Sequence, residues 1–113
     1  MNAEVKAKWL EALRSGKYKQ GQGRLRSRDN KFCCLGVLED VLETPWTLKG
    51  TRFAVPDGGI PDAYSGTLSP NSQVRCGISL HAIDHLTALN DGINNDGVGE
   101  TFSVIADYIE ANL

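Results

Sequence analysis

The sequence has few cysteines and no long hydrophobic run. None of its apolar stretches approaches the roughly 20 residues that a membrane-spanning helix needs. The first residues include an early glutamate and form no apolar signal segment. The three cysteines, Cys33, Cys34 and Cys76, are an odd number with one adjacent pair, which is a poor framework for disulfides. These absences predict a cytoplasmic protein with reduced thiols and no membrane contact.

Common nucleotide, cofactor and metal motifs are also absent. The sequence contains neither the GxxxxGK[ST] phosphate loop nor the GxGxxG dinucleotide motif. His81 and His85 have the spacing of a zinc-binding helix, but Ala82 stands where the HExxH motif has its glutamate, and no complete ligand set follows. Residues 91–97 do not fit the first and last ligand positions of a calcium-binding EF-hand loop. We therefore expect no cofactor and no metal.

The length of 113 residues predicts one domain spanning residues 1–113. Apolar side chains that recur every three or four residues indicate four helices. These helices are expected at about residues 3–15, 31–43, 80–89 and 102–113, with Ser79 and Thr101 capping the last two. Gly36 lies inside the second helix and predicts that another backbone approaches closely there.

Alternating side chains indicate several short strands. The strands are expected at residues 24–28, in a hairpin at residues 46–55, and at residues 73–76. Residues 56–72, rich in proline and glycine, and the polar residues 91–99 are expected to be loops. The resulting fold class is α+β, a single small domain with helices packed on a small antiparallel sheet.

Charge is distributed unevenly along the chain. Residues 1–31 hold nine Lys and Arg against three acids, a net charge of +6. Residues 32–113 hold three Lys and Arg against eleven acids, a net charge of −8. This separation predicts a basic N-terminal face that suits an anionic small molecule or an acidic host protein. The overall pI near 5.6 disfavours duplex nucleic acid as a partner.

The arginines at residues 24–28 form the most distinctive local pattern. Arg24, Arg26 and Arg28 alternate with other residues, so a strand there places three guanidinium groups on one face. Guanidinium groups bind phosphate through paired hydrogen bonds, and a ring such as that of Tyr18 stacks on a base. The alternative is an edge strand that is kept charged against aggregation. The candidate ligand-binding residues are Lys17, Tyr18, Gln20, Arg24 and Arg26.

The adjacent cysteines suggest a second kind of site. Cys33 and Cys34 lie near the predicted start of a helix, where the helix dipole lowers the pKa of a thiol. Together with His81 or His85 they would make the cysteine–histidine arrangement of a hydrolase or transferase. The alternative is that both thiols are small buried side chains in the core. We expect the chain to have no catalytic residues, and these four residues form the alternative set.

Three blocks of sequence stand out beyond this periodicity. They are WLEALRSGKYKQ at residues 9–20, FCCLGVL at residues 32–38 and LTALND at residues 86–91. These blocks resemble a family of small proteins from tailed phages and prophages. Glu39 departs from the pattern, because relatives in that family often carry a third cysteine there. The resemblance implies a phage or mobile-element origin, and with it the cytoplasm of a host cell, but no established activity.

Three functions follow from these patterns. The first is a phage-type accessory binding protein that sequesters an anionic, nucleotide-like signal or inhibits a host protein through its basic N-terminal face. The second is a small cysteine-dependent hydrolase or transferase. The third is an oligomeric structural or assembly protein whose apolar patch includes Trp46 and Phe53. We expect the first function, which makes the chain a binding protein rather than an enzyme and leaves its oligomeric state open.

Overall fold

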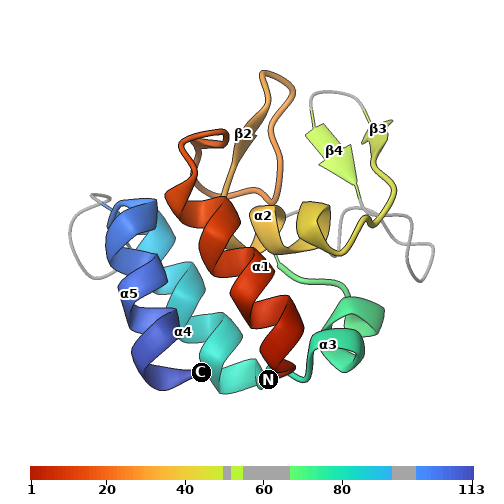
Figure 1. The fold of residues 1–113 in the computed structure, drawn as a ribbon. Helices are drawn as coiled ribbons and strands as arrows, with labels where there is room; N and C mark the ends of the chain where they lie inside the picture. Colours follow the sequence, from red (N-terminus) through yellow and green to blue (C-terminus); the bar gives the residue numbers. More distant parts are fainter. Residues whose placement is uncertain (50–51, 55–66, 93–98) are drawn as a thin grey trace.

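The computed structural model describes residues 1–49, 52–54, 67–92 and 99–113, which form an α+β fold (Figure 1). The helices in these ranges are α1 (Ala3–Arg14), α2 (Cys34–Val41), α3 (Pro70–Cys76), α4 (Leu80–Asp91) and α5 (Phe102–Asn112). The strands in these ranges are β1 (Lys19–Gln20), β2 (Lys31–Phe32), β3 (Thr47–Lys49) and β4 (Arg52–Ala54). Within the described ranges, no helix is long and apolar enough to cross a membrane.

The helices surround one hydrophobic core. α1 packs against α2 and α5, and α4 packs against the same two helices from another side (Figure 1). The apolar stripes of these helices face inward, and burying each large side chain contributes about 1.5–3 kcal/mol to folding. The largest fully buried side chains of these four helices include Trp9, Leu35, Leu38, Ile83, Leu86, Ile105 and Ile109.

Polar side chains set where the helices begin. Ser79 accepts a hydrogen bond from the backbone N–H of Ala82, and Thr101 accepts one from Val104, so both predicted caps are confirmed. At the other end of α4, Gly92 adopts a left-handed conformation with φ of 70°, which suits glycine and ends the helix. α4 therefore extends two residues beyond the predicted end and includes Asn90.

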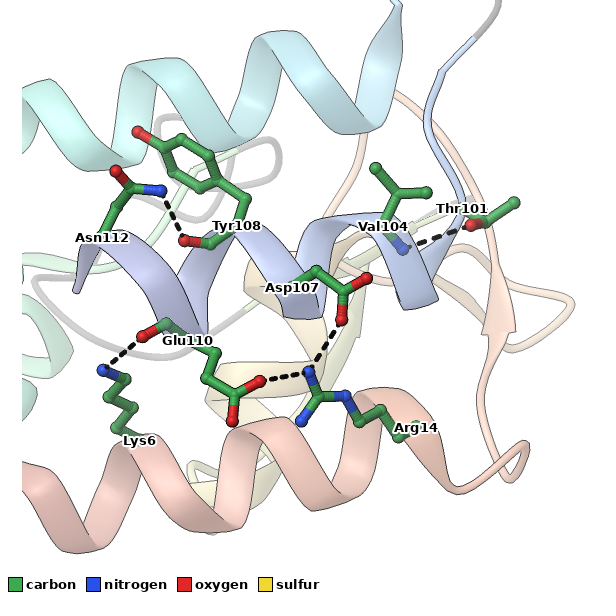
Figure 2. A network of polar contacts seen from close by, with 8 residues as sticks. All are labelled: Lys6, Arg14, Thr101, Val104, Asp107, Tyr108, Glu110 and Asn112. Carbon is green, nitrogen blue, oxygen red and sulfur yellow. Dashed lines mark hydrogen bonds and ion pairs between the residues drawn. The ribbon is translucent and has the colours of Figure 1, made fainter.

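Ion pairs join the first helix to the last. The Arg14 Nη2 atom lies 2.9 Å from Asp107 Oδ1 and 2.8 Å from Glu110 Oε2 (Figure 2). The Lys6 ammonium also donates to the backbone carbonyl of Glu110. Cations of α1 are thus partly neutralised by the acidic C-terminal helix.

The predicted single antiparallel sheet is wrong. The strands form two separate pairs: β1 and β2 are parallel, with Lys19 opposite Lys31, whereas β3 and β4 are antiparallel, with Leu48 opposite Phe53. The hairpin predicted at residues 46–55 is therefore confirmed, although its residues 50, 51 and 55 lie outside the described residues. Helix-on-helix packing, rather than a sheet beneath the helices, builds the core.

The predicted strand at residues 24–28 is also wrong. Only an isolated antiparallel bridge between Arg26 and Phe32 forms there. Leu25 is fully buried, and its backbone lies so close to α2 that a Cβ atom on Gly36 would be 1.7 Å from the Leu25 carbonyl oxygen. The close backbone approach predicted at Gly36 is confirmed, and it lets Leu25 reach the core against α2.

The remaining differences concern where helices begin. α2 starts at Cys34 rather than near residue 31, because Lys31 and Phe32 pair with β1 instead. Residues 73–76 are the end of α3 rather than a strand: Ser69 caps this helix and Pro70 occupies its first turn. Residues 70–72, which were expected to be loop, also belong to α3. Residues 56–66 of the same predicted loop lie outside the described residues.

Candidate functional site

The predicted ligand-binding residues lie on two opposite sides of β1 and β2. Successive residues of a strand point to opposite faces. Lys19 and Lys31 are exposed, whereas their neighbours Gln20 and Phe32 point toward the core and are half-buried and buried. Lys17, two residues before Lys19, is also exposed. We call Lys17, Lys19 and Lys31 the outer lysines.

The outer lysines bring like charges together. Lys19 and Lys31 are register partners on neighbouring strands, which lie about 4.8 Å apart. Like charges placed directly opposite each other destabilise a strand pair. Asp29 offsets part of this charge, because its Oδ2 atom lies 3.7 Å from Lys31 Nζ, but both side chains are exposed and such a pair is weak. Residues 17–31 hold six Lys and Arg and one acid, a net charge of +5.

Tyr18 is anchored by the chain itself. Its hydroxyl donates to Asp40 Oδ2 at 2.5 Å, and its ring meets Phe32 edge-on with centroids 5.0 Å apart. Burial, and then the hydrogen bond to Asp40, raise the pKa of Tyr18 to about 12. The hydroxyl therefore stays protonated and holds the ring in one position.

Arg26 packs into the same cluster instead of lying on an open face. Its guanidinium carbon lies 5.2 Å from the Phe32 ring centroid and 5.5 Å from that of Trp46. Its Nε and Nη2 atoms both donate to Asn30 Oδ1, at 3.1 and 2.6 Å. We call Tyr18, Arg26, Phe32, Asp40 and Trp46 the aromatic–arginine cluster.

Trp46 closes the aromatic–arginine cluster by donating from Nε1 to Asp40 Oδ1 at 3.1 Å. This position removes Trp46 from the exposed apolar patch expected for an oligomeric protein, while the side chain of Phe53 lies outside the described part. Arg24 is half-buried, so the three arginines do not form the shared exposed face that the sequence predicted.

Gln20 connects distant parts of the fold. Its Nε2 donates to Asn90 Oδ1 and to the Glu100 carbonyl at 3.1 and 2.7 Å, and its Oε1 accepts from the Phe102 N–H. The whole carboxamide is thus used to join β1 to α4 and α5. These bonds give Gln20 a structural role.

Asn90, which was not among the predicted site residues, is the main polar junction of the core. Its side chain is 1% exposed, accepts from Gln20 and from the Cys34 N–H, and donates to Gly21 O and to Asp91 Oδ1. Such a saturated buried amide fixes its neighbours, because breaking any bond leaves a polar group unpaired. The one feature of the sequence that could have pointed to this residue is the asparagine of the LTALND block.

The cysteines are buried. The Cys33 sulfur caps α2 by accepting from the Gly36 N–H, and burial raises the pKa of Cys33 to about 12. Burial also raises the pKa of Cys34. This is opposite to the lowering expected at a helix start, because desolvation of the thiolate outweighs the dipole.

The structure does not bring the histidines to these thiols. His81 and His85 lie on the exposed side of α4, where the His85 ring packs against Tyr108 at 4.6 Å between centroids. Cys34 belongs to α2 and faces the buried side of α4, where its sulfur lies 3.7 Å from the Leu86 carbonyl oxygen. In the part of the chain that the structure describes, no three His, Cys, Asp or Glu residues gather as metal ligands.

Glu39 is a second polar residue of the core that was not among the predicted site residues. It is fully buried, accepts a hydrogen bond from Thr44 Oγ1 at 3.3 Å and one from the Ser69 N–H at 3.4 Å, and lies beside the Ser72 hydroxyl. Burial raises the pKa of this carboxyl, although the surrounding donors oppose the change. These bonds join α2 to the start of α3.

Two hollows open near these residues. One of about 240 Å³ is lined by Gln20, Gln22, Asn90, Gly99, Glu100 and Thr101. The side-chain amides of Gln20 and Asn90, which line this hollow, already form hydrogen bonds within the fold. Another, of about 180 Å³, lies beside α1 and is lined by Lys8, Glu11, Ala12, Ser15, Lys17 and Tyr18. The second hollow contains two of the predicted ligand-binding residues, Lys17 and Tyr18.

A family model described as a domain of unknown function (DUF8296) matches residues 1–54. The matched segment contains α1 and α2, the four strands, all five predicted ligand-binding residues and both adjacent cysteines. It ends before α3, α4 and α5. No curated protein and no solved structure matches the chain.

Proposed function

We propose that the chain is a non-enzymatic accessory protein that binds an anionic, phosphate-bearing ligand on its outer lysines. The observation that carries this proposal is the placement of Lys19 directly opposite Lys31 on an exposed strand pair. An external anion between the two ammonium groups would turn a destabilising contact into a favourable one. The ligand that suits them carries phosphate, as a nucleotide-like signal does.

The cysteines favour binding over catalysis. A catalytic cysteine needs an accessible thiolate at neutral pH. Cys33 and Cys34 are buried, and their pKa values are raised. The imidazoles that would activate them lie on the exposed side of α4. A role in sequestering a signal during phage infection, which the resemblance suggested, is part of this proposal.

Titration with inorganic tripolyphosphate tests the proposal. The double variant Lys19→Gln/Lys31→Gln should weaken binding up to about thirtyfold, because two charged contacts of at most roughly 1 kcal/mol each are lost. The controls are Arg75→Glu, which lowers the total charge by the same two units, and Arg75→Gln, which removes one exposed cation on α3. Arg75→Gln should leave the affinity unchanged.

Two results would contradict the proposal. One is that the wild-type chain shows no binding of tripolyphosphate in low salt. The other is that Arg75→Gln weakens binding as much as neutralising Lys19 and Lys31 does, which would mean that the anion responds only to net charge.

A protein partner is the second candidate function. The observation that favours it is the exposure of large apolar side chains around the junction of α3 and α4, where Val74 is 82% and Leu80 66% exposed. Exposed apolar groups of this size mark interaction surfaces when they are contiguous. Pull-down from host lysate with Val74→Ser/Leu80→Ser as the control variant tests it, and capture that is equal for both chains contradicts it.

A further inference from the structure

The hollow beside Lys17 has a defined size and wall. It lies where α1 ends and the chain turns toward β1, and its volume is about 180 Å³. Pockets that enclose a drug-sized ligand are usually about 300–1,000 Å³, and a water molecule takes about 30 Å³ in the liquid. The hollow therefore has room for one ring system, and the rest of a larger ligand must lie outside it.

The wall of this hollow combines an aromatic ring, a small apolar side chain and a carboxylate with the donor groups of Lys8, Ser15 and Lys17. Tyr18 contributes an aromatic ring that its hydrogen bond to Asp40 holds in place. Ala12 contributes a small apolar surface, and Glu11 contributes a carboxylate, which can only accept hydrogen bonds when ionised. An aromatic surface with a neighbouring acceptor suits a planar ring that carries an amino group.

The hollow is continuous with the outer lysines. Lys17 lines it, and Lys19 follows two residues later, so the Cα atoms of the two lysines lie at most about 7 Å apart. A ligand whose ring entered the hollow would therefore place its charged chain next to Lys17 and Lys19. This spacing joins a ring-binding site to a phosphate-binding site on one side of the molecule.

We infer that the hollow beside Tyr18 binds the amino-bearing base of a nucleotide whose phosphates lie on the outer lysines. This inference rests on the proposed phosphate binding and names the class of ligand that it serves. The fixed Tyr18 ring lowers the entropic cost of binding, because it has the same position with and without ligand. Glu11 selects bases that offer an amino group over bases that offer a carbonyl oxygen at the same place.

Calorimetric titration with ATP, CTP, UTP and inorganic tripolyphosphate, without added metal, tests this inference. ATP should bind roughly tenfold more tightly than tripolyphosphate, the advantage expected of one base against an aromatic ring. CTP should bind more tightly than UTP, because cytosine carries an amino group where uracil carries a carbonyl oxygen, while the neighbouring N3 is an acceptor in cytosine and an N–H in uracil. Glu11→Gln should reduce that difference, because the new amide can also donate.

Ala12→Leu fills the hollow and provides the key variant. It should remove the advantage of ATP over tripolyphosphate while leaving tripolyphosphate affinity unchanged. Ala7→Leu is the matched control, because Ala7 is exposed on the same helix and outside the hollow, and it should change neither affinity. Backbone NMR of the wild-type chain gives a readout that needs no variant: ATP, but not tripolyphosphate, should shift the Ala12 amide signal.

The outcomes separate the two proposals. If tripolyphosphate and all nucleotides fail to bind, both the proposed function and this inference are overturned. If tripolyphosphate binds but ATP has no advantage, or if Ala12→Leu behaves as Ala7→Leu does, the base site alone is overturned. If ATP does not shift the Ala12 amide signal, the base site is overturned in the same way.

Discussion

The two sides of residues 17–32 use basic residues in opposite ways. On the inner side, Arg26 packs against Phe32 and Trp46 and becomes part of the aromatic–arginine cluster. On the outer side, Lys19 and Lys31 stand opposite each other in solvent. A planar, weakly hydrated guanidinium suits a stacked, half-buried place, whereas a strongly hydrated ammonium suits an open surface. Positive charge in this segment therefore lies in two settings, one packed inside the fold and one open to solvent, and the proposed anion binding uses the second.

The largest expected effect concerns the contact that supports the inner side. Gly36→Ala places a Cβ atom 1.7 Å from the Leu25 carbonyl oxygen, so the backbone leading to Arg26 must shift. We expect a loss of about 3 kcal/mol or more in the free energy of unfolding, measured in urea. Gly16→Ala is the control: its Cβ meets nothing within 4 Å, and the cost comes only from a φ of 77°. Equal losses in the two variants would contradict the close contact.

Asn90→Ala should have the next largest effect. It leaves the Cys34 N–H and the Gly21 carbonyl without their partner in the core, which should lower the free energy of unfolding by about 2–3 kcal/mol. Asn112→Ala removes a single exposed hydrogen bond to Tyr108 and should cost less than about 0.5 kcal/mol. If Asn90→Ala lowered the free energy of unfolding no more than Asn112→Ala does, the Asn90 junction would not stabilise the inner side.

Arg26→Ala and Lys19→Ala test the comparison directly. Arg26→Ala should lower the free energy of unfolding by about 1–2 kcal/mol, because it removes the stacking on two rings and the bonds to Asn30. Lys19→Ala should change stability by less than about 0.5 kcal/mol. Tripolyphosphate affinity should show the reverse order, with the larger loss in Lys19→Ala. If Lys19→Ala were the more destabilising variant, the two roles would be assigned wrongly.

The smallest expected effect is a pH dependence inside the fold. The raised pKa of Glu39 means that the folded chain binds more protons than the unfolded chain above the ordinary glutamate pKa of about 4.3. The free energy of unfolding should therefore fall as the pH rises from that value through the raised pKa. Glu39→Gln should remove this fall, whereas exposed Glu43→Gln should keep it, as urea unfolding at several pH values would show. Parallel pH curves for wild type and Glu39→Gln would contradict the prediction.

The sequence predicted the longer helices well, because their signals are local. α4 and α5 combine regular apolar spacing with caps at Ser79 and Thr101. α3 has only seven residues, too few to establish a helical period. Polar and apolar residue types alternate from Gln73 to Cys76 and so imitate a strand, although Val74 is exposed and Cys76 buried in the helix. Strands of two residues, such as β1 and β2, give no period at all.

The candidate site was harder to predict than the helices. Lys17 and Tyr18 line one hollow, but Gln20 and Arg26 are used inside the fold. Their roles depend on partners such as Asn90 and Trp46, far away in the sequence. Local alternation could not show that Arg26 packs on Phe32 and Trp46 instead of sharing an exposed face with Arg24 and Arg28. Lys31, which lies opposite Lys19, was missed because the parallel pairing has no local signal.

The Asn90 junction also bears on how the chain folds during synthesis. Gln20 reaches its partners at Asn90 and Glu100 only across 70 and 80 positions of sequence, and Arg14 meets Asp107 across 93. Contacts between residues so distant in the chain slow folding, because long loops must close first. On the ribosome, residues 1–54 therefore have to wait for α4 and α5 to emerge before their polar groups are satisfied. A nascent chain stalled before Asn90 would present an unfinished core, which makes it a natural substrate for chaperones.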